Sequence, residues 1–216
     1  YSSSSSRLIH VKNSTKIKEI KLGGLDAQFR LAPKIRLEYN EKKIQANKPK
    51  IAAVLALFYP NDNNTVSLLL TKRASYNGTH SGQISFPGGK TEVSDYNLEE
   101  TALRETFEET GVFKENTTIL REFTDVYIPP SNFLVTPFIG VCHTKPSFKK
   151  NNEVEEILEI SYDDILDDNN IHFTQINNSY MEKTSVPCFQ INGLIIWGAT
   201  AMILSEIKEA LKNIKP

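Results

Sequence analysis

The sequence has few cysteines and no long run of apolar residues. Its two cysteines, Cys142 and Cys188, form no Cys-x-x-Cys pair, which excludes a disulfide-stapled scaffold and a cysteine-rich zinc site. The longest apolar stretches, 51–58 and the interrupted 194–204, are much shorter than the roughly 20 residues of a membrane-spanning helix. We therefore exclude a collagen, a coiled coil and a membrane-spanning protein, and we take a reducing compartment as the simpler interpretation.

The overall composition is that of a folded domain, but the charge is unevenly distributed. Of 216 residues, 39% are hydrophobic and 24% are charged, which is typical of a globular chain with a sizeable core. Residues 1–50 hold 12 Lys and Arg against 4 Asp and Glu, whereas the remainder holds 13 against 22. A basic leader ahead of an acidic body is typical of a targeting segment or a nucleic-acid-binding arm.

The composition also suggests how the chain is divided. Residues 1–23 are Ser-rich, basic and poor in acids, so we expect a disordered tail or a targeting leader of the mitochondrial kind. Residues 24–50 form a polar lead-in segment, and residues 51–213 form the main domain. A mitochondrial location is the prediction, with peroxisomal and cytoplasmic locations as the alternatives.

Hydrophobic periodicity predicts an α/β domain. The clearest helix is 98–110, which lacks Gly and Pro and is followed by Gly111, a residue that favours a helix end. A second helix is predicted at 200–211, and a hairpin at 51–59 and 66–71. Further strands are predicted at 83–86, 118–128, 135–142, 153–160, 171–176 and 188–191.

Three glutamates on the first helix suggest a metal site. Glu105, Glu108 and Glu109 lie at i, i+3 and i+4, on one helix face. Carboxylates so close together repel one another unless a cation lies among them, and hard ions such as Mg²⁺ or Mn²⁺ prefer such oxygen ligands. The alternative is a solvated acidic helix face. A Gly-Gly corner at 88–89 would let the backbone approach this site closely.

Taken together, these residues resemble the Nudix hydrolase box. The matching positions are Gly89, Asp95, Arg104-Glu105, Glu108-Glu109 and Gly111. There are two departures: eight residues rather than seven separate Asp95 from Arg104, and Thr106 replaces an apolar residue. The Arg-Glu-x-x-Glu-Glu core is intact.

A second motif resembles that of one Nudix subgroup, the coenzyme A diphosphatases. It runs from Leu69-Leu70-Thr71-Lys72-Arg73 to Phe86-Pro87-Gly88-Gly89, with the subgroup's spacing kept. Ala74 replaces a Ser and Gly78 replaces an Arg of that motif. The stretches 127–140 and 196–201 also look like the subgroup, so the resemblance covers roughly 51–211.

The resemblance implies a fold, a cofactor and site residues. The implied fold is the Nudix-type α/β/α sandwich with a mixed β-sheet, and the implied cofactor is Mg²⁺ or Mn²⁺. The implied metal ligands are Glu105, Glu108, Glu109 and the Gly89 carbonyl; Arg104 joins the three glutamates as a catalytic residue by pairing with one of them. The implied substrate-binding residues are Arg73, His80, Gly82, Phe86, Pro87, Gly88, Tyr127 and Thr136. Trp197 is expected in the core, with ligand stacking as the less favoured alternative.

The implied reaction is hydrolysis of the diphosphate of coenzyme A or its derivatives, giving 4′-phosphopantetheine and adenosine 3′,5′-bisphosphate. One alternative is a Nudix diphosphatase acting on oxidised nucleotides or ADP-ribose, and another is a non-catalytic Nudix-fold binding module. The predicted partner is a small molecule, with no nucleic acid and no membrane; the basic leader lacks the interleaved aromatics of a nucleic-acid site. The oligomeric state stays open.

Overall fold

A mixed β-sheet forms the centre of the molecule. The computed structural model describes residues 11–75, 83–178 and 181–214. Strand β1 (Lys50–Pro60) pairs in parallel with β7 (Phe133–Val141) and antiparallel with β2 (Val66–Arg73), so the predicted mixed sheet and hairpin are confirmed. The other strands of this eight-stranded sheet are β3 (Ile84–Ser85), β4 (Gly88–Lys90), β5 (Thr118–Glu122), β6 (Val126–Ile128) and β8 (Val154–Ser161).

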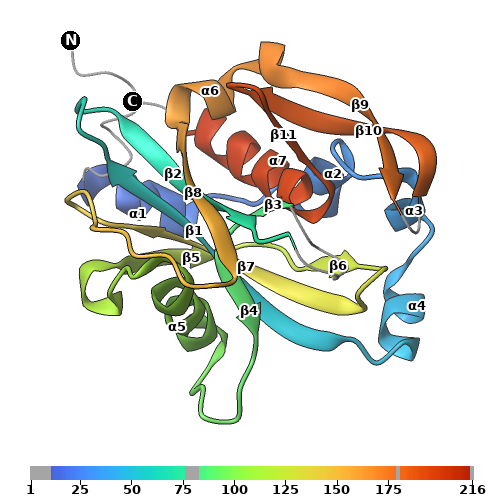
Figure 1. Cartoon of the computed structure of the whole chain (residues 1–216), viewed down its shortest axis with the longest axis horizontal. Coiled ribbons are helices and arrows are strands. Elements are labelled where there is room, and N and C mark those ends of the chain that lie inside the picture. The colour runs from blue at the N-terminus through green and yellow to red at the C-terminus, as the bar shows by residue number, and fades with distance from the viewer. Residues whose placement is uncertain (1–10, 76–82, 179–180, 215–216) are drawn as a thin grey trace.

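Strand β1 is apolar along most of its length because both of its faces are covered. Leu55, Leu57 and Tyr59 pack into the cluster that includes Ala102 of helix α5 (Leu98–Thr110). The alternate residues, such as Phe58, pack into the larger cluster on the opposite face, which includes helix α7 (Gly198–Lys212). A strand buried on both sides reads as a continuous apolar run. Figure 1 shows α5 and α7 on opposite sides of the sheet, as expected for a layered α/β/α fold.

Helix α5 has the predicted limits, because local signals define both of its ends. The Asn97 side chain accepts a hydrogen bond from the Glu100 amide at 2.9 Å, which caps the first turn. Gly111 has a φ of 77°, the left-handed conformation that commonly ends a helix. The three glutamates of interest therefore lie in the second half of a well-defined helix.

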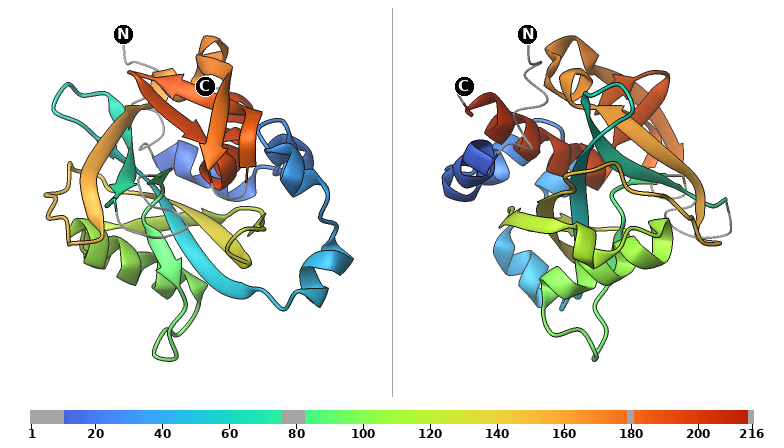
Figure 2. Two further views of the ribbon diagram at one scale, coloured as in Figure 1. Left: turned by 45° about the vertical axis from the view of Figure 1, so that its right-hand side comes forward. Right: turned by 90° about the vertical axis from the view of Figure 1, so that its left-hand side faces the viewer.

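A separate three-stranded antiparallel sheet covers the side of α7. It consists of β9 (Ile171–Asn178), β10 (Met181–Ile191) and β11 (Leu194–Trp197). Strand β10 is much longer than the predicted 188–191, since its first half is polar and lacks an apolar signal. Figure 2 shows this sheet beside α7, with helix α6 (Tyr162–Leu166) close by.

Between residue 11 and the sheet the structure has four short helices: α1 (Val11–Glu19), α2 (Gly24–Phe29), α3 (Lys34–Leu37) and α4 (Glu41–Ala46). Ile17 of α1 is only 1% exposed and belongs to the larger core cluster. Part of the segment 1–23, for which the composition suggests a tail or a leader, thus packs on the core. Within the described ranges, no helix is both long and apolar enough to cross a bilayer.

Candidate active site

Three carboxylates from two parts of the fold meet beside the Gly-Gly corner. Oxygens of Glu105 and Glu109 on α5, and of Glu153 just before β8, all lie within 4.8 Å of one another. Strand β8 pairs with β2, with Val154 opposite Arg73, and this pairing brings Glu153 to α5. Sequence reasoning missed Glu153 because it is one of several glutamates in 153–159 with no distinctive spacing.

The carboxylate cluster has the chemistry of a divalent-cation site. Glu109 is 4% exposed, and burial together with the nearby Glu105 raises its pKa to about 8, although Arg73 opposes this shift. Burial also raises the pKa of Glu105. Oxygen ligands held this closely fit Mg²⁺ or Mn²⁺, and a cation among them would offset the cost of keeping them ionised.

Glu108 lies apart from this cluster. Its side chain is 48% exposed, and its Oε1 is 3.3 Å from Arg104 Nη1. The predicted i,i+4 pair between Arg104 and Glu108 is therefore present. The helix spacing brings Glu105 and Glu109 together, but the third carboxylate beside them, that of Glu153, comes from the residue just before β8 and not from α5.

Arg104 connects the loop before α5 to the carboxylate cluster. Its Nε and Nη2 donate to the two oxygens of Asp95 at 2.8 and 2.9 Å, and its Nη1 donates to Glu105 at 3.0 Å. The Asp95 side chain is only 4% exposed and also accepts a hydrogen bond from Thr101 Oγ1 at 2.8 Å. The Arg104 guanidinium holds the pKa of Asp95 well below its usual range. Asp95, one residue out of the usual spacing, thus still serves to orient Arg104.

The corner at Gly88 and Gly89 leaves no room for side chains. A Cβ at position 88 would lie 2.4 Å from the carbonyl oxygen of Ala53, and one at position 89 would lie 2.6 Å from Glu105 Cδ. The Gly88 amide faces Glu109 Oε2 at 3.4 Å. Glycine is therefore required at position 88, where the backbone of β1 occupies the space, whereas a side chain at position 89 would displace the Glu105 carboxylate.

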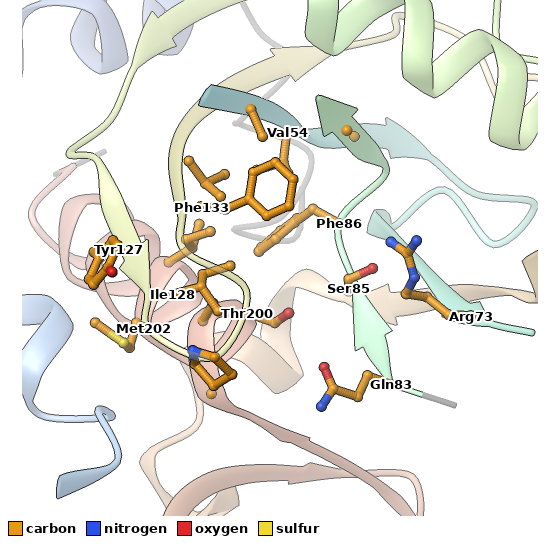
Figure 3. Close-up of a pocket in the computed structure, with 18 of the residues that line it drawn as sticks. Val54, Arg73, Gln83, Ser85, Phe86, Tyr127, Ile128, Phe133, Thr200 and Met202 are labelled. Atoms are coloured by element: carbon orange, nitrogen blue, oxygen red, sulfur yellow. The ribbon is translucent and has the colours of Figure 1, made fainter. Parts of the chain in front are cut away.

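The three carboxylates line one end of a cavity of about 390 Å³. Figure 3 shows Arg73 and Gln83 on one side of this cavity and Tyr127 and Met202 on the other, with Phe86 between them. Much of the wall is apolar, as in small-molecule sites generally. Segments far apart in the sequence complete the wall: Ile35 and Arg36 from α3, Phe133 and Val135 from β7, and Trp197, Thr200 and Met202 at the start of α7.

The predicted substrate-binding residues divide into three groups. Arg73, Phe86, Gly88 and Tyr127 line the cavity, as does the predicted metal ligand Gly89. Pro87 and Thr136 are absent from the described lining, and Thr136 instead donates to Asp125 Oδ1 at 2.7 Å. His80 and Gly82 lie outside the described residues.

Trp197 differs from its expected place in the core. It is half-buried, because it is the last residue of β11, directly before α7, and forms part of the cavity wall. The less favoured interpretation, in which Trp197 contacts a ligand, fits this position better.

Comparison with known proteins agrees with this arrangement. The model of the NUDIX domain matches residues 49–177, which is more than half of the chain. The chain belongs to the NUDIX domain family. This result confirms the family predicted from the box and places both α5 and Glu153 inside the matched region. The described parts of 24–48 and the whole of α7 lie outside it.

Relatives at moderate identity carry Nudix hydrolase names. "Nudix hydrolase 22, chloroplastic" of Arabidopsis thaliana is 33% identical over 165 residues, covering 73% of this chain and 54% of that protein. "Nudix hydrolase 15, mitochondrial" of the same plant is also 33% identical, with 73% and 57% covered. "Uncharacterized Nudix hydrolase NudL" of Pectobacterium atrosepticum is 29% identical over 185 residues, with 83% and 88% covered. The chain thus spans little more than half the length of the two plant proteins.

Solved structures agree on the fold. The Nudix hydrolase RenU of M. smegmatis superposes with a TM-score of 0.54 at 19% identity, covering 78% of this chain and 89% of that one. The predicted α/β fold with a mixed sheet is therefore confirmed. At this identity the likeness concerns the fold alone.

Proposed function

We propose that this protein is a metal-dependent hydrolase that cleaves a diphosphate bond in a nucleotide derivative. The observation that carries the proposal is the meeting of Glu105, Glu109 and Glu153 within 4.8 Å at one end of a cavity large enough for a small molecule. Family membership and the hydrolase names of the relatives support the same class of reaction. A module that only binds a ligand does not need such a dense cluster of acids.

The residues of the site have separate tasks in this proposal. Glu105, Glu109 and Glu153 would hold the cation, with the Gly89 carbonyl and Glu108 as further candidate ligands. A Mg²⁺ or Mn²⁺ held there would supply charge neutralisation at the diphosphate and make the attacking water more acidic. One carboxylate of the cluster would accept the proton of that water. Arg104, fixed by Asp95, orients Glu105 through the hydrogen bond of 3.0 Å between them.

We propose coenzyme A or one of its derivatives as the substrate. The motif that resembles the coenzyme A diphosphatases supplies Arg73 and Phe86, and both residues line the cavity next to the carboxylate cluster. A guanidinium beside Glu109 can pair with a substrate phosphate, and an aromatic ring can pack against a nucleobase or a pantetheine arm. The products would be 4′-phosphopantetheine and adenosine 3′,5′-bisphosphate.

A substrate panel tests this proposal. Purified protein is incubated with coenzyme A, dephospho-coenzyme A, ADP-ribose or an oxidised nucleoside triphosphate, each with Mg²⁺ or Mn²⁺, and the products are identified by mass. We expect coenzyme A to give the highest kcat/KM. Equal kcat/KM values across the panel would instead indicate a general nucleoside diphosphatase. If no compound is cleaved in a metal-dependent way, the result would favour a non-catalytic binding module.

We also propose a mitochondrial location for the protein. The Ser-rich, basic composition of residues 1–23 supports it, and one plant relative carries a mitochondrial name while another carries a chloroplastic one. Residues 1–23 joined to a fluorescent reporter should direct it to mitochondria. A reporter that stays in the cytoplasm contradicts the proposed location without affecting the proposed reaction.

A further inference from the structure

Arg36 is a buried cation in the wall of the same cavity. It lies on α3, in the lead-in segment outside the region that matches the family model, and it is only 4% exposed. Its guanidinium is 6.0 Å from the centre of the Tyr127 ring, and Tyr127 lies on the side of the cavity opposite Arg73 (Figure 3). Arg36 thus lies away from the carboxylate cluster but lines the same space.

The partners of Arg36 are neutral. Its Nη1 donates to the Tyr39 carbonyl at 2.9 Å, and its guanidinium stacks between Phe29, at 5.2 Å, and Tyr127. Its buried Nε has no hydrogen-bond partner among the described residues. In that same part of the chain, no carboxylate forms an ion pair with it.

A buried cation without an anion is unusual enough to need an explanation. Removing a charge from water is costly unless the charge is paired with an opposite charge. Burial lowers the pKa of Arg36, which reflects the same cost. The two aromatic faces offset part of it. An anion entering through the cavity would supply the missing partner, and a planar guanidinium matches the geometry of phosphate oxygens.

We propose that Arg36 binds a phosphate monoester of the substrate at the end of the cavity away from the carboxylate cluster. This inference rests on the proposed function and deepens it, because it requires a substrate with a second phosphate separate from the diphosphate. In coenzyme A the 3′-phosphate meets that requirement. Arg36 is therefore a specificity-determining residue that favours such substrates over their dephosphorylated counterparts.

Tyr127 positions Arg36 in this arrangement. Its hydroxyl donates to Asn132 Oδ1 at 2.8 Å and accepts from Asn47 Nδ2 at 3.1 Å, so both interactions tie the ring to the loops around β1 and β7. The ring itself faces the guanidinium and also packs on Tyr39 at 5.4 Å between ring centres. The predicted substrate-binding role of Tyr127 thus becomes an indirect one.

A binding experiment tests the role of Arg36 without relying on turnover. Adenosine 3′,5′-bisphosphate and AMP, neither of which contains an anhydride, are titrated calorimetrically into the wild-type protein and into Arg36→Met, in one Mg²⁺ buffer. We expect the wild type to bind the bisphosphate about 10- to 100-fold more tightly than AMP, the range of a charge-assisted contact. In Arg36→Met this ratio should fall close to one.

Arg30→Met is the matched control. Arg30 lies in the same lead-in segment, but its side chain is 64% exposed, pairs with Glu209 at 3.4 Å and is not part of the described cavity lining. Its removal should leave the ratio of the two affinities as in the wild type. Arg36→Lys keeps the charge without the planar fork and should retain only part of the ratio.

The possible outcomes separate the two proposals. Equal wild-type affinities for the two ligands, or an equal loss of both in Arg36→Met, would assign Arg36 a structural role and overturn the inference. If Arg36→Met unfolds at a lower temperature than the wild type, the inference is judged instead from the ratio of the two affinities in the wild type and in Arg36→Lys. If Arg36→Met loses affinity for the bisphosphate but not for AMP, and the wild type cleaves no compound of the substrate panel, the phosphate site is supported and the proposed reaction is contradicted.

Discussion

The two ends of the cavity differ in chemistry and in origin. The carboxylate end combines Glu105, Glu109 and Glu153, all within the region 49–177 that matches the family. The aromatic end combines Arg36 and Tyr127 with Met202, and two of these three lie outside that region. One end thus has the chemistry to hold a metal and a diphosphate, whereas in the proposed function the other end would contact the group attached to the diphosphate.

This difference explains why family membership and substrate choice are separate questions. Two of the three residues of the carboxylate end, Glu105 and Glu109, belong to the motif that predicted the family. Segments that precede and follow the matched region in the sequence contribute to the aromatic end. Such segments can change without disturbing the metal site. Substitutions at the carboxylate end should therefore change kcat, while substitutions at the aromatic end should change KM or the preference between substrates.

The largest effect is expected for Glu109→Gln. The change keeps the shape of the side chain but removes a charge from the cluster, so kcat should fall by about 100- to 1,000-fold, as when one key electrostatic group is removed from an active site. The thermal midpoint should not drop, since the amide keeps the shape of a side chain whose ionised form is disfavoured by burial. Glu115→Gln, at an exposed position after α5, is the control. A near-normal rate in Glu109→Gln would contradict the assignment of the catalytic chemistry to the carboxylate end.

A second test compares Glu153→Gln with Glu108→Gln. The structure brings Glu153 and not Glu108 within 4.8 Å of the other two carboxylates. We therefore expect Glu153→Gln to reduce kcat/KM by roughly 10- to 100-fold, as the loss of a metal-site group does, and Glu108→Gln to reduce it less. Steady-state rates at several Mg²⁺ concentrations measure both. The reverse order would favour the ligand set expected from helix spacing.

Asp95→Asn tests the support behind the carboxylate end. It weakens the paired hydrogen bonds to Arg104, so the free energy of unfolding should fall by about 1–2 kcal/mol near neutral pH. Because the folded pKa of Asp95 is lowered, its contribution is present above the unfolded pKa and is lost as the pH falls below about 4.

Denaturant titrations of the wild type and Asp95→Asn at pH 7 and pH 3 measure this difference. The two proteins should differ less in stability at pH 3 than at pH 7. A gap of equal size at both pH values would mean that the ion pair does not carry the effect.

The smallest effect is expected at Trp197 in the cavity wall. Trp197→Leu removes part of the cavity wall but keeps it apolar, so KM should rise by about 3- to 10-fold with little change in kcat, in line with a modest loss of apolar contact. Phe173→Leu, on the same three-stranded sheet but 72% exposed, is the control. A fall in kcat without a change in KM would place Trp197 in the chemistry of the site.

Several elements could be predicted because their signals are local. The run 51–59 alternates between two buried faces, and α5 has a capping Asn and a terminal Gly within its own sequence. Strand β10 was underestimated since its pairing with β9, and not its own apolar content, makes its first half a strand. Helix α1 was missed for a similar reason: Ile17 gains its burial from packing near β5, which no local pattern reveals.

The sequence by itself determined the family, the helix that carries Glu105 and Glu109, and the glycine corner beside it, because each depends on residues close together in the chain. Only the tertiary structure decided that Glu153 is the third carboxylate and that Arg36 and Trp197 share a cavity with it. These residues reach the site through the pairing of β8 with β2 and the packing of α3 and α7 around the sheet. Such long-range contacts form where whole apolar faces meet, so a single polar residue carries no mark of them in the sequence.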